Sequence, residues 1–474
     1  MKKFSFCLAL IFIIYACNEK KDSSPSDINA DGLIVQKIDS IGNHFIEQGK
    51  VLGFSIAVLR KGDTLYNKAF GYIDSAKTKP ATTRTIYKIA SITKAHVASM
   101  VLKLQEEGKL SLEDTLHKWL PDYPNKDQAQ KIKIRHLISH TSGIPDYANT
   151  LDNEFLVTGD PPNKKTYYDF IKNKPLLFEP DWGWSYSNTG FVLMAMIIEK
   201  ATGNSYEDEV QRIIAKPMKF KSLNHYYKHK LKDGISPTFE FKDSVITGSH
   251  WDKFSWIKGD GGLSNTALDL AHFPLGLNNG TLINKQSLEK MTQAQSLANG
   301  IKVDYGLGLR MGDFEGENLW GHTGGEESTW GMLKYMPERD ISIAVLVNTN
   351  STPHDALEIW GRVALVVLGK KEPKHSDLPI TEDLLGKIVG DYKYVDFPDE
   401  RLYEVYQGND GHIYVKGKNS DSRGEKLNHL GEGKFALTTY TMDRIIFHEN
   451  GVGEIVGYSV YANGSFRGLR NKVN

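Results

Sequence analysis

Residues 89–94 read IASITK and place Ser91 three residues before Lys94. On a helix, residues at this spacing lie one turn apart on the same side, so the lysine amine can reach the serine hydroxyl. The preceding run TIYKIA (85–90) is typical of a strand, and an apolar helical pattern follows as far as Gly108. We therefore place Ser91 at the start of a helix, where unpaired backbone N–H groups stabilise developing negative charge.

The Ser-x-x-Lys spacing is a weak signal by itself, because it recurs at Ser255–Lys258 and at Ser287–Lys290. A glycine-rich loop follows the first of these pairs, and the second lies in a polar segment typical of a surface helix. Two interpretations of Ser91 are open at this point. It is either an ordinary N-cap serine or a nucleophile with a lysine as its base.

Two further motifs bear on that choice. Tyr186-Ser187-Asn188 follows a loop rich in aromatic residues and precedes an apolar helix expected over 191–201. A tyrosine can transfer protons in catalysis, and an asparagine can orient its neighbours. The run GHTGG (321–325) contains glycines that let a strand approach a ligand closely through its backbone.

In this order, Ser-x-x-Lys, Tyr-x-Asn and His-Thr-Gly resemble the signature of the serine β-lactamase and penicillin-binding protein superfamily. The His-Thr-Gly variant resembles the class C β-lactamase-related serine hydrolases, which include esterases, D-aminopeptidases and DD-carboxypeptidases. Three longer stretches also resemble that family: IRHLISHTSGIPDY (134–147), FEPDWGWSYSNTGFVLM (178–194) and GDGGLSNTALDLAHF (259–273). The resemblance covers about 30–368. It implies an α/β (α+β) fold of the β-lactamase type, with an antiparallel sheet flanked by helices and a helical subdomain.

The resemblance also implies a role for each motif residue. Ser91 would attack a carbonyl and become acylated, and Lys94 and Tyr186 would share the proton transfers, with the identity of the base left open. The substrate-binding residues would be Asn188, His322, Thr323, Gly324 and Gly325. The backbone N–H groups of Ser91 and Gly325 would form an oxyanion hole, in which one donor is typically worth about 10²–10³ in rate.

His322 takes the place of a lysine that, in other members, helps to hold a substrate carboxylate. Histidine is neutral for much of the time near pH 7, which argues against β-lactams and against peptides with a free carboxylate. Glu326 and Glu327 follow directly. If they face the cleft they repel a carboxylate and favour a neutral or cationic substrate, whereas if they face solvent they have no such effect.

Other side chains suggest further sites, each with a plainer interpretation. Trp182, Trp184 and Trp330 line an apolar pocket or simply pack. His136 and His140 are four residues apart and could bind a metal from one helix face, but no glutamate stands between them as in a metalloprotease motif. We expect no metal and no cofactor. Lys+Arg and Asp+Glu both total 58, and without a clustered basic face we expect no nucleic-acid partner.

The N-terminus is typical of an export signal. Two lysines precede a mostly apolar run over 4–15, which ends at Ala16 and Cys17. This end resembles a bacterial lipobox, so we expect a signal peptide over 1–16, lipid on Cys17 and a polar tether over 17–29. The chain would then be an exported lipoprotein of the cell envelope, in the periplasm or on the outer membrane. The alternative is a plain secretory signal.

The rest of the chain divides by composition. We expect the hydrolase domain over 30–369, a Lys- and Pro-bearing linker over 370–379, and a small antiparallel, lipocalin-like β-barrel over 380–474. Within these domains we expect a helix over 30–48, a hairpin of strands 54–60 and 64–70, strands within 332–349, a helix over 354–369, and barrel strands near 402–408, 412–418, 434–440, 444–450 and 454–462. The barrel could cover the cleft and restrict substrate length.

These observations predict an exported serine hydrolase that acts through an acyl-serine on small esters, amides or short peptides, including D-amino-acid peptides. A β-lactamase or DD-carboxypeptidase is the alternative within the same class. An acyl-trapping penicillin-binding or sensor module, without efficient turnover, is the alternative from another class. The sequence leaves the oligomeric state open.

Overall fold

A computed structural model of the chain describes residues 25–49, 51–149, 164–226, 234–242, 245–248, 258–326, 328–350, 354–395 and 402–473. Cys17, the expected signal peptide and Ser255 lie outside these residues. Helix α1 (Pro25–Glu47) begins at Pro25, so its first residues take the place of the last part of the tether expected over 17–29. Among the described helices, none combines the length and the apolar character needed to cross a bilayer.

The hydrolase region is built on six strands in the order β2-β1-β13-β12-β11-β10, each antiparallel to its neighbours. Their bounds are β1 (Gly53–Arg60), β2 (Asp63–Gly71), β10 (Arg310–Phe314), β11 (Glu317–Glu326), β12 (Thr329–Met336) and β13 (Ile341–Val347). The expected β1–β2 hairpin and the two strands within 332–349 are confirmed. Every residue of β13 is buried, since helices cover both faces of the sheet.

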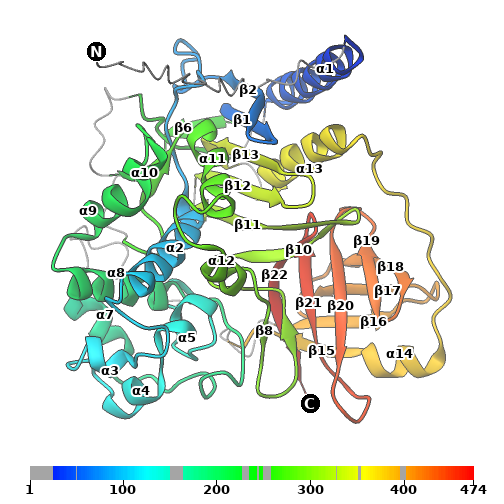
Figure 1. The fold of residues 1–474 in the computed structure, drawn as a ribbon. Helices are drawn as coiled ribbons and strands as arrows, with labels where there is room; N and C mark the ends of the chain where they lie inside the picture. The colour runs from blue at the N-terminus through cyan, green and yellow to red at the C-terminus, as the bar shows by residue number, and fades with distance from the viewer. Residues whose placement is uncertain are drawn as a thin grey trace, which may run out of the picture.

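Helices α1 and α13 (His354–Leu368) pack on one face of this sheet, and α2 (Thr93–Glu106) and α11 (Ala267–Asn278) pack on the other (Figure 1). The alternation of strand side chains separates two apolar cores. Met332 belongs to the core under α1 and α13, whereas the next residue, Leu333, belongs to the core under α2 and α11. The expected flanked antiparallel sheet is therefore confirmed.

The helical subdomain extends from the α2 side of the sheet (Figure 1). Its helices and turns are α3 (Leu116–Trp119), α4 (Lys126–Lys131), α5 (Ile134–Ser139), η2 (Tyr147–Asn149), α7 (Lys164–Ile171), α8 (Asn188–Thr202), α9 (Tyr206–Val210), η3 (Gln211–Ala215), α10 (Lys216–Met218) and α12 (Lys285–Met291). Short strands complete the region: β3 (Tyr87–Lys88), β4 (Asn224–His225), β5 (Phe239–Lys242), β6 (Val245–Gly248), β7 (Leu263–Asn265), β8 (Gln295–Ser296), β9 (Lys302–Val303) and β14 (Thr349–Asn350).

Residues 370–381 contain neither helix nor strand and lead to α14 (Glu382–Ile388) and a closed barrel of eight antiparallel strands. The barrel strands are β15 (Gly390–Lys393), β16 (Tyr403–Gln407), β17 (Ile413–Gly417), β18 (Glu425–Gly431), β19 (Lys434–Leu437), β20 (Arg444–Glu449), β21 (Ile455–Ala462) and β22 (Ser465–Lys472). The first strand pairs with the last, which closes the barrel. The expected barrel is confirmed, although β15, β18 and β22 were not foreseen.

The barrel is joined to the hydrolase sheet along one strand (Figure 1). Strand β22 pairs with β10 at Ser465 and Gly312, so all fourteen strands form one continuous sheet. Apolar packing supports this joint, because Phe466 is fully buried and its ring centroid lies 5.0 Å from that of Trp184. The last strand of the barrel is therefore separated by β10 alone from β11, the strand that carries the His-Thr-Gly motif.

Candidate active site

Ser91 lies on the tight turn η1 (Ala90–Ile92), immediately before α2. Its neighbour Ala90 is buried and has φ +44°, a left-handed conformation that non-glycine residues adopt only under strain. The Ser91 hydroxyl caps neither η1 nor α2, so the N-cap interpretation is wrong. Instead the hydroxyl oxygen accepts a hydrogen bond from Lys94 Nζ at 3.0 Å.

Lys94 is fully buried in the first turn of α2, and three acceptors surround its amine. Besides Ser91 Oγ, Lys94 Nζ donates to Asn188 Oδ1 at 2.7 Å and to the backbone oxygen of Asp260 at 2.6 Å. No carboxylate of a described residue forms an ion pair with Lys94. The three donors of an ammonium group are thus matched by three neutral oxygens.

Asn188 is the first residue of α8, and two hydrogen bonds to Asp146 fix its orientation. The backbone N–H and the side-chain Nδ2 of Asn188 both donate to the Asp146 carboxylate at 3.0 Å. Ser187 caps the helix by accepting from the Gly190 N–H. The amide oxygen of Asn188 therefore has to point toward Lys94, since its NH₂ group is already held.

Tyr186 lies with its ring beside two cations. Lys94 Nζ is 4.9 Å and Arg310 Cζ is 5.0 Å from the ring centroid. The half-buried phenol makes no hydrogen bond to another described residue. The structure thus brings Tyr186 beside Lys94, the partner of Ser91, and leaves its hydroxyl available.

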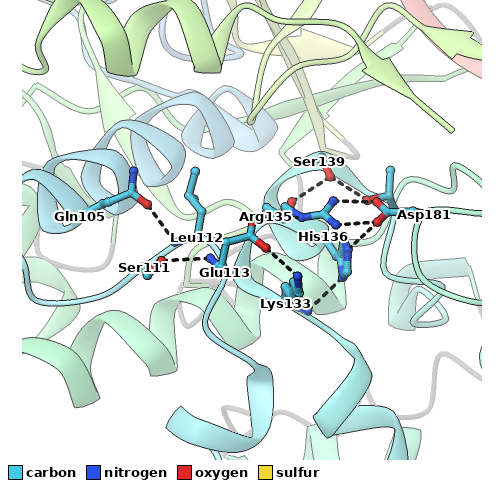
Figure 2. Close-up of polar contacts among 10 residues, drawn as sticks. Gln105, Ser111, Leu112, Glu113, Lys133, Arg135, His136, Ser139 and Asp181 are labelled. Carbon is cyan, nitrogen blue, oxygen red and sulfur yellow. Dashed lines mark hydrogen bonds and ion pairs between the residues drawn. The ribbon is translucent and has the colours of Figure 1, made fainter. Parts of the chain in front are cut away.

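Figure 2 shows the polar network that holds the loop leading to Tyr186. Arg135 donates through two nitrogens to the Asp181 carboxylate at 2.7 and 2.6 Å, and His136 Nε2 donates to it at 3.0 Å. Burial acts to raise the pKa of Asp181, but the hydrogen bonds from His136 and Arg135 hold that pKa well below its usual value. Because Lys133 N–H donates to His136 Nδ1, both ring nitrogens of His136 are occupied by this network.

His140, Tyr305 and His322 form a buried hydrogen-bond chain with a defined direction. The backbone N–H of Ser187 donates to His140 Nδ1 at 3.0 Å, so His140 Nε2 carries the proton and donates to Tyr305 Oη at 3.1 Å. Tyr305 then donates to His322 Nε2 at 3.2 Å, and His322 Nδ1 donates to the Thr323 carbonyl at 2.5 Å. His136 and His140 thus serve separate networks, with no ring nitrogen left for a shared metal.

This chain keeps His322 uncharged. Burial, together with the positive charges of Arg310 and Lys94, lowers the pKa of His322 well below its usual value. Both ring nitrogens already have partners that fit the neutral tautomer. His322 is therefore neutral at pH 7 and does not supply the positive charge that a lysine would at this position.

Gly324 lets strand β11 lie directly against the Ser91 turn. A side chain at this position would place its Cβ 2.2 Å from the backbone oxygen of Ile89 and 3.2 Å from the Ala90 Cβ. Gly325, the next residue, is exposed at the end of the strand. The end of β11 therefore lies beside Ser91, where the resemblance placed the oxyanion donors.

Glu326 is mostly buried and lies 3.9 Å from Lys88 Nζ, so it is paired rather than free to repel a substrate, and Glu327 lies outside the described residues. Trp184 packs against Phe466 of the barrel, which supports the packing interpretation, and Trp182 is exposed.

Five residues at the site were not foreseen: Asp146, Asp260, Tyr305, Arg310 and Arg467. Asp146 and Asp260 lie inside the stretches quoted for the family resemblance, so those stretches carried a signal. Arg467 lies in the barrel and donates to Thr323 Oγ1 at 2.5 Å. Nothing near Arg467 in the sequence marks it as a neighbour of the His-Thr-Gly motif.

Comparisons with known proteins agree with this geometry. The pattern that defines the family described as Beta-lactamase matches residues 38–368. The chain is 32% identical over 316 residues to penicillin-binding protein 4* of Bacillus subtilis, covering 62% of this chain and 68% of that protein.

Solved structures share the fold and extend the likeness to the barrel. The octameric penicillin-binding protein homologue from Pyrococcus abyssi matches with a TM-score of 0.63 at 27% identity, over 92% of this chain and 99% of that chain. A D-stereospecific amidohydrolase from Streptomyces matches with a TM-score of 0.59 at 25% identity, over 71% of this chain and 98% of that chain. The chain therefore belongs to the beta-lactamase family and is a serine hydrolase.

Proposed function

We propose that Ser91 is the nucleophile of this hydrolase and that Lys94 activates it. The observation that carries the proposal is the position of Lys94 Nζ, which is buried and lies 3.0 Å from Ser91 Oγ. A nucleophile and a base within this distance, with the base oriented by further groups, is the arrangement that nucleophilic catalysis requires. Asn188 and the Asp260 carbonyl supply that orientation.

The three oxygens around Lys94 fit either protonation state of the amine. A neutral amine can donate to Asn188 Oδ1 and the Asp260 carbonyl while it accepts the Ser91 proton. After attack, the ammonium can donate to all three positions. The proton can thus move from Ser91 Oγ to Lys94 Nζ without any other hydrogen bond in the site being broken.

In this mechanism Ser91 Oγ adds to the substrate carbonyl, and the leaving group departs with a proton. The unpaired hydroxyl of Tyr186 is the group that can pass that proton on, and later activate the water that releases the acyl group. The backbone N–H groups of Ser91 and Gly325 would hold the developing oxyanion. The close contact of Gly324 with the Ser91 turn supports this placement.

We propose amides and esters of small peptide-like compounds as substrates, with D-amino-acid derivatives as the first to test. Support comes from the D-stereospecific amidohydrolase, whose whole length this chain resembles in fold at 25% identity. The test follows hydrolysis of D-alanine and L-alanine p-nitroanilides and of a chromogenic short-chain ester by the full chain and by its Ser91→Ala variant.

Each outcome of that test has a distinct meaning. Steady release of product beyond one equivalent, absent in Ser91→Ala, is the expected result. Release of one equivalent followed by a plateau would favour the acyl-trapping module. Equal release by both proteins would remove Ser91 from the mechanism.

We also propose that the chain is exported and anchored to the membrane by lipid on Cys17. The charged start, the apolar run over 4–15 and the Ala16-Cys17 pair support this proposal. Expression in a bacterium fed a labelled fatty acid tests it. The label should appear on the wild type in the membrane fraction and be absent from Cys17→Ser, and an unlabelled, soluble wild-type protein would contradict the anchor.

A further inference from the structure

The side chain of Asp260 is a buried carboxyl group that none of the proposed steps uses. Asp260 contacts Lys94 through its backbone, because its carbonyl oxygen accepts from Lys94 Nζ at 2.6 Å. Asp260 is 4% exposed, and its Oδ1 has no hydrogen-bond donor from another described residue. Burying a carboxylate costs free energy unless a cation or several donors compensate for the lost water. An ionised Asp260 therefore needs a positive charge close by.

A short hydrogen bond holds the Asp260 carboxyl in place. Tyr147 Oη donates to Asp260 Oδ2 at 2.5 Å, and burial raises the pKa of Tyr147 well above its usual value, so the phenol keeps this proton. The preceding residue, Asp146, accepts both hydrogen bonds that orient Asn188. Two adjacent residues therefore position two of the three oxygens around Lys94.

Among the described groups that face the Asp260 carboxyl, Lys94 is the one that carries a positive charge. These groups come from α2, η2, α7, α9 and β11, and they are Lys94, Tyr147, Tyr167, Tyr206 and Glu326. Burial raises the pKa values of the three tyrosines, so they remain neutral. Glu326 lies 3.9 Å from Lys88 Nζ, so its own charge is paired. Lys94 is therefore the counter-charge of Asp260.

Asp260 is ionised at neutral pH. Burial raises the pKa of Asp260 to about 6, and both the charge of Lys94 and the hydrogen bond from Tyr147 oppose that rise. Above pH 6 the carboxyl group is mostly a carboxylate. This negative charge belongs to the same residue whose carbonyl oxygen contacts Lys94 Nζ. An anion so placed stabilises the ammonium form of Lys94 relative to the neutral amine.

We propose that Asp260 is a positioning residue whose carboxylate stabilises the ammonium group that Lys94 becomes when it takes the Ser91 proton. The proton moves from Ser91 Oγ to Lys94 Nζ as Oγ bonds to the substrate carbonyl carbon, and no proton passes to Asp260. Tyr147 holds the carboxylate for this role. The inference deepens the proposed function and rests on it, since it takes Lys94 to be the base.

The dependence of kcat/KM on pH distinguishes this role from a purely structural one. Asp260→Asn keeps the shape of the side chain and removes its charge. We expect the acid limb of the profile to move to lower pH by about one unit, because the Lys94 ammonium loses its stabilisation. The plateau should fall by about three- to tenfold, because a less basic amine takes the serine proton less readily. A structural defect would lower the plateau without moving the acid limb.

Two further variants sharpen the test. Tyr147→Phe removes a hydrogen bond that favours the ionised carboxyl, so the acid limb should shift in the same direction, by less than in Asp260→Asn. In the double variant Tyr147→Phe should add no further shift, since the charge is already gone. Asp443→Asn is the matched control. Burial also raises the pKa of this barrel carboxyl to about 6, and its loss should leave the acid limb in place.

The profiles are measured on the full chain with p-nitrophenyl butyrate, after subtraction of the rate of Ser91→Ala, and thermal unfolding of each variant checks the fold. If Asp260→Asn leaves the profile unchanged, or lowers the plateau alone, the role of Asp260 is overturned while the Ser91 mechanism stands. If Lys94→Met keeps the wild-type rate, Lys94 is not the base, and the proposed function fails together with this inference.

A titration that needs no turnover decides the inference if the wild type does not cleave the ester. The chain is labelled with carbon-13 at the lysine Cε, and the Lys94 resonance is identified in NMR spectra as the one absent from Lys94→Met. Its chemical shift reports the ionisation of the amine directly. A midpoint about one pH unit lower in Asp260→Asn than in the wild type would support the inference, and equal midpoints would overturn it.

Discussion

The two sides of the site differ in how the chain encodes them. On the motif side, Ser91, Lys94 and Asn188 come from short motifs and are joined by direct hydrogen bonds. On the barrel side, Phe466 and Arg467 come from a strand near the end of the chain that carries no motif. The groups that carry out the chemistry of this hydrolase are therefore encoded in short motifs, whereas the barrel side depends on where a second domain docks.

The two sides also differ in how well their polar groups are satisfied. Lys94 has three acceptors for its three donors, so the motif side is complete without a ligand. Arg310 keeps a buried Nε without an acceptor, and Arg467 forms no ion pair with a described residue. A complete network suits proton transfer.

The largest effect is expected on the motif side, from Lys94→Met. Methionine fills a similar volume but removes the amine that takes the Ser91 proton, so kcat/KM should fall by about 10³-fold or more, for charged and neutral substrates alike. Lys103→Met on the same helix is the control, because Lys103 is partly exposed and pairs with Glu106. Steady-state kinetics measure both. A loss of kcat/KM confined to carboxylate substrates would contradict the assignment of proton transfer to Lys94 on the motif side.

Gly324→Ala should have the next largest effect. Its methyl group would lie 2.2 Å from the backbone oxygen of Ile89, so β11 has to move away from the Ser91 turn. Displacement of reacting groups by about 1 Å can cost roughly 10²-fold in rate, mainly in kcat. Gly386→Ala in α14 is the control, since no atom lies within 4 Å of the added methyl group. Wild-type kcat in Gly324→Ala would show that this contact does not position the site.

Tyr305→Phe tests the hydrogen-bond chain that lies between the two sides. Loss of the hydroxyl leaves His140 Nε2 and His322 Nε2 buried without their shared partner, which typically costs about 1–3 kcal/mol of stability. We expect a lower unfolding temperature and, since β11 loosens, about a tenfold loss in kcat/KM. In Tyr123→Phe, where the hydroxyl bonds no described residue, both quantities should stay near wild type.

The smallest effect concerns stability against pH. Burial raises the pKa of Asp260 to about 6, so folding favours the protonated carboxyl. Stability contributed by this group is present at pH 4 and is lost as the pH rises through 6, by at most roughly 3 kcal/mol. Asp260→Asn does not titrate. The unfolding temperature of the variant minus that of the wild type should therefore increase between pH 4 and 7, and a constant difference would contradict the shift.

Much of the hydrolase fold is readable from local patterns. The apolar run over 54–60 and the β-rich run over 64–70 flank a Lys-Gly-Asp turn, and the structure has a hairpin there. The helix over 354–368 follows from its apolar periodicity. The Ser91–Lys94 contact follows from helical spacing, because both residues lie within one turn.

The barrel side was harder to predict for a physical reason. Strand β22 reads SFRGLRNK, and its three cations and glycine break the apolar alternation by which strands are recognised. One of those cations, Arg467, is the residue that reaches Thr323. Its position depends on pairing between β22 and β10, residues more than a hundred positions apart, which no local pattern contains.

Detection of an acyl group on Ser91 tests the central claim most directly. The full chain is mixed with an excess of a D-alanine ester, quenched in acid within milliseconds to seconds, digested, and analysed by mass spectrometry. We predict the added mass of one acyl group on the peptide that contains Ser91, forming in the wild type and absent from Lys94→Met on the same timescale. Turnover of the ester with an acyl group on another residue would contradict the assignment of Ser91 as the nucleophile.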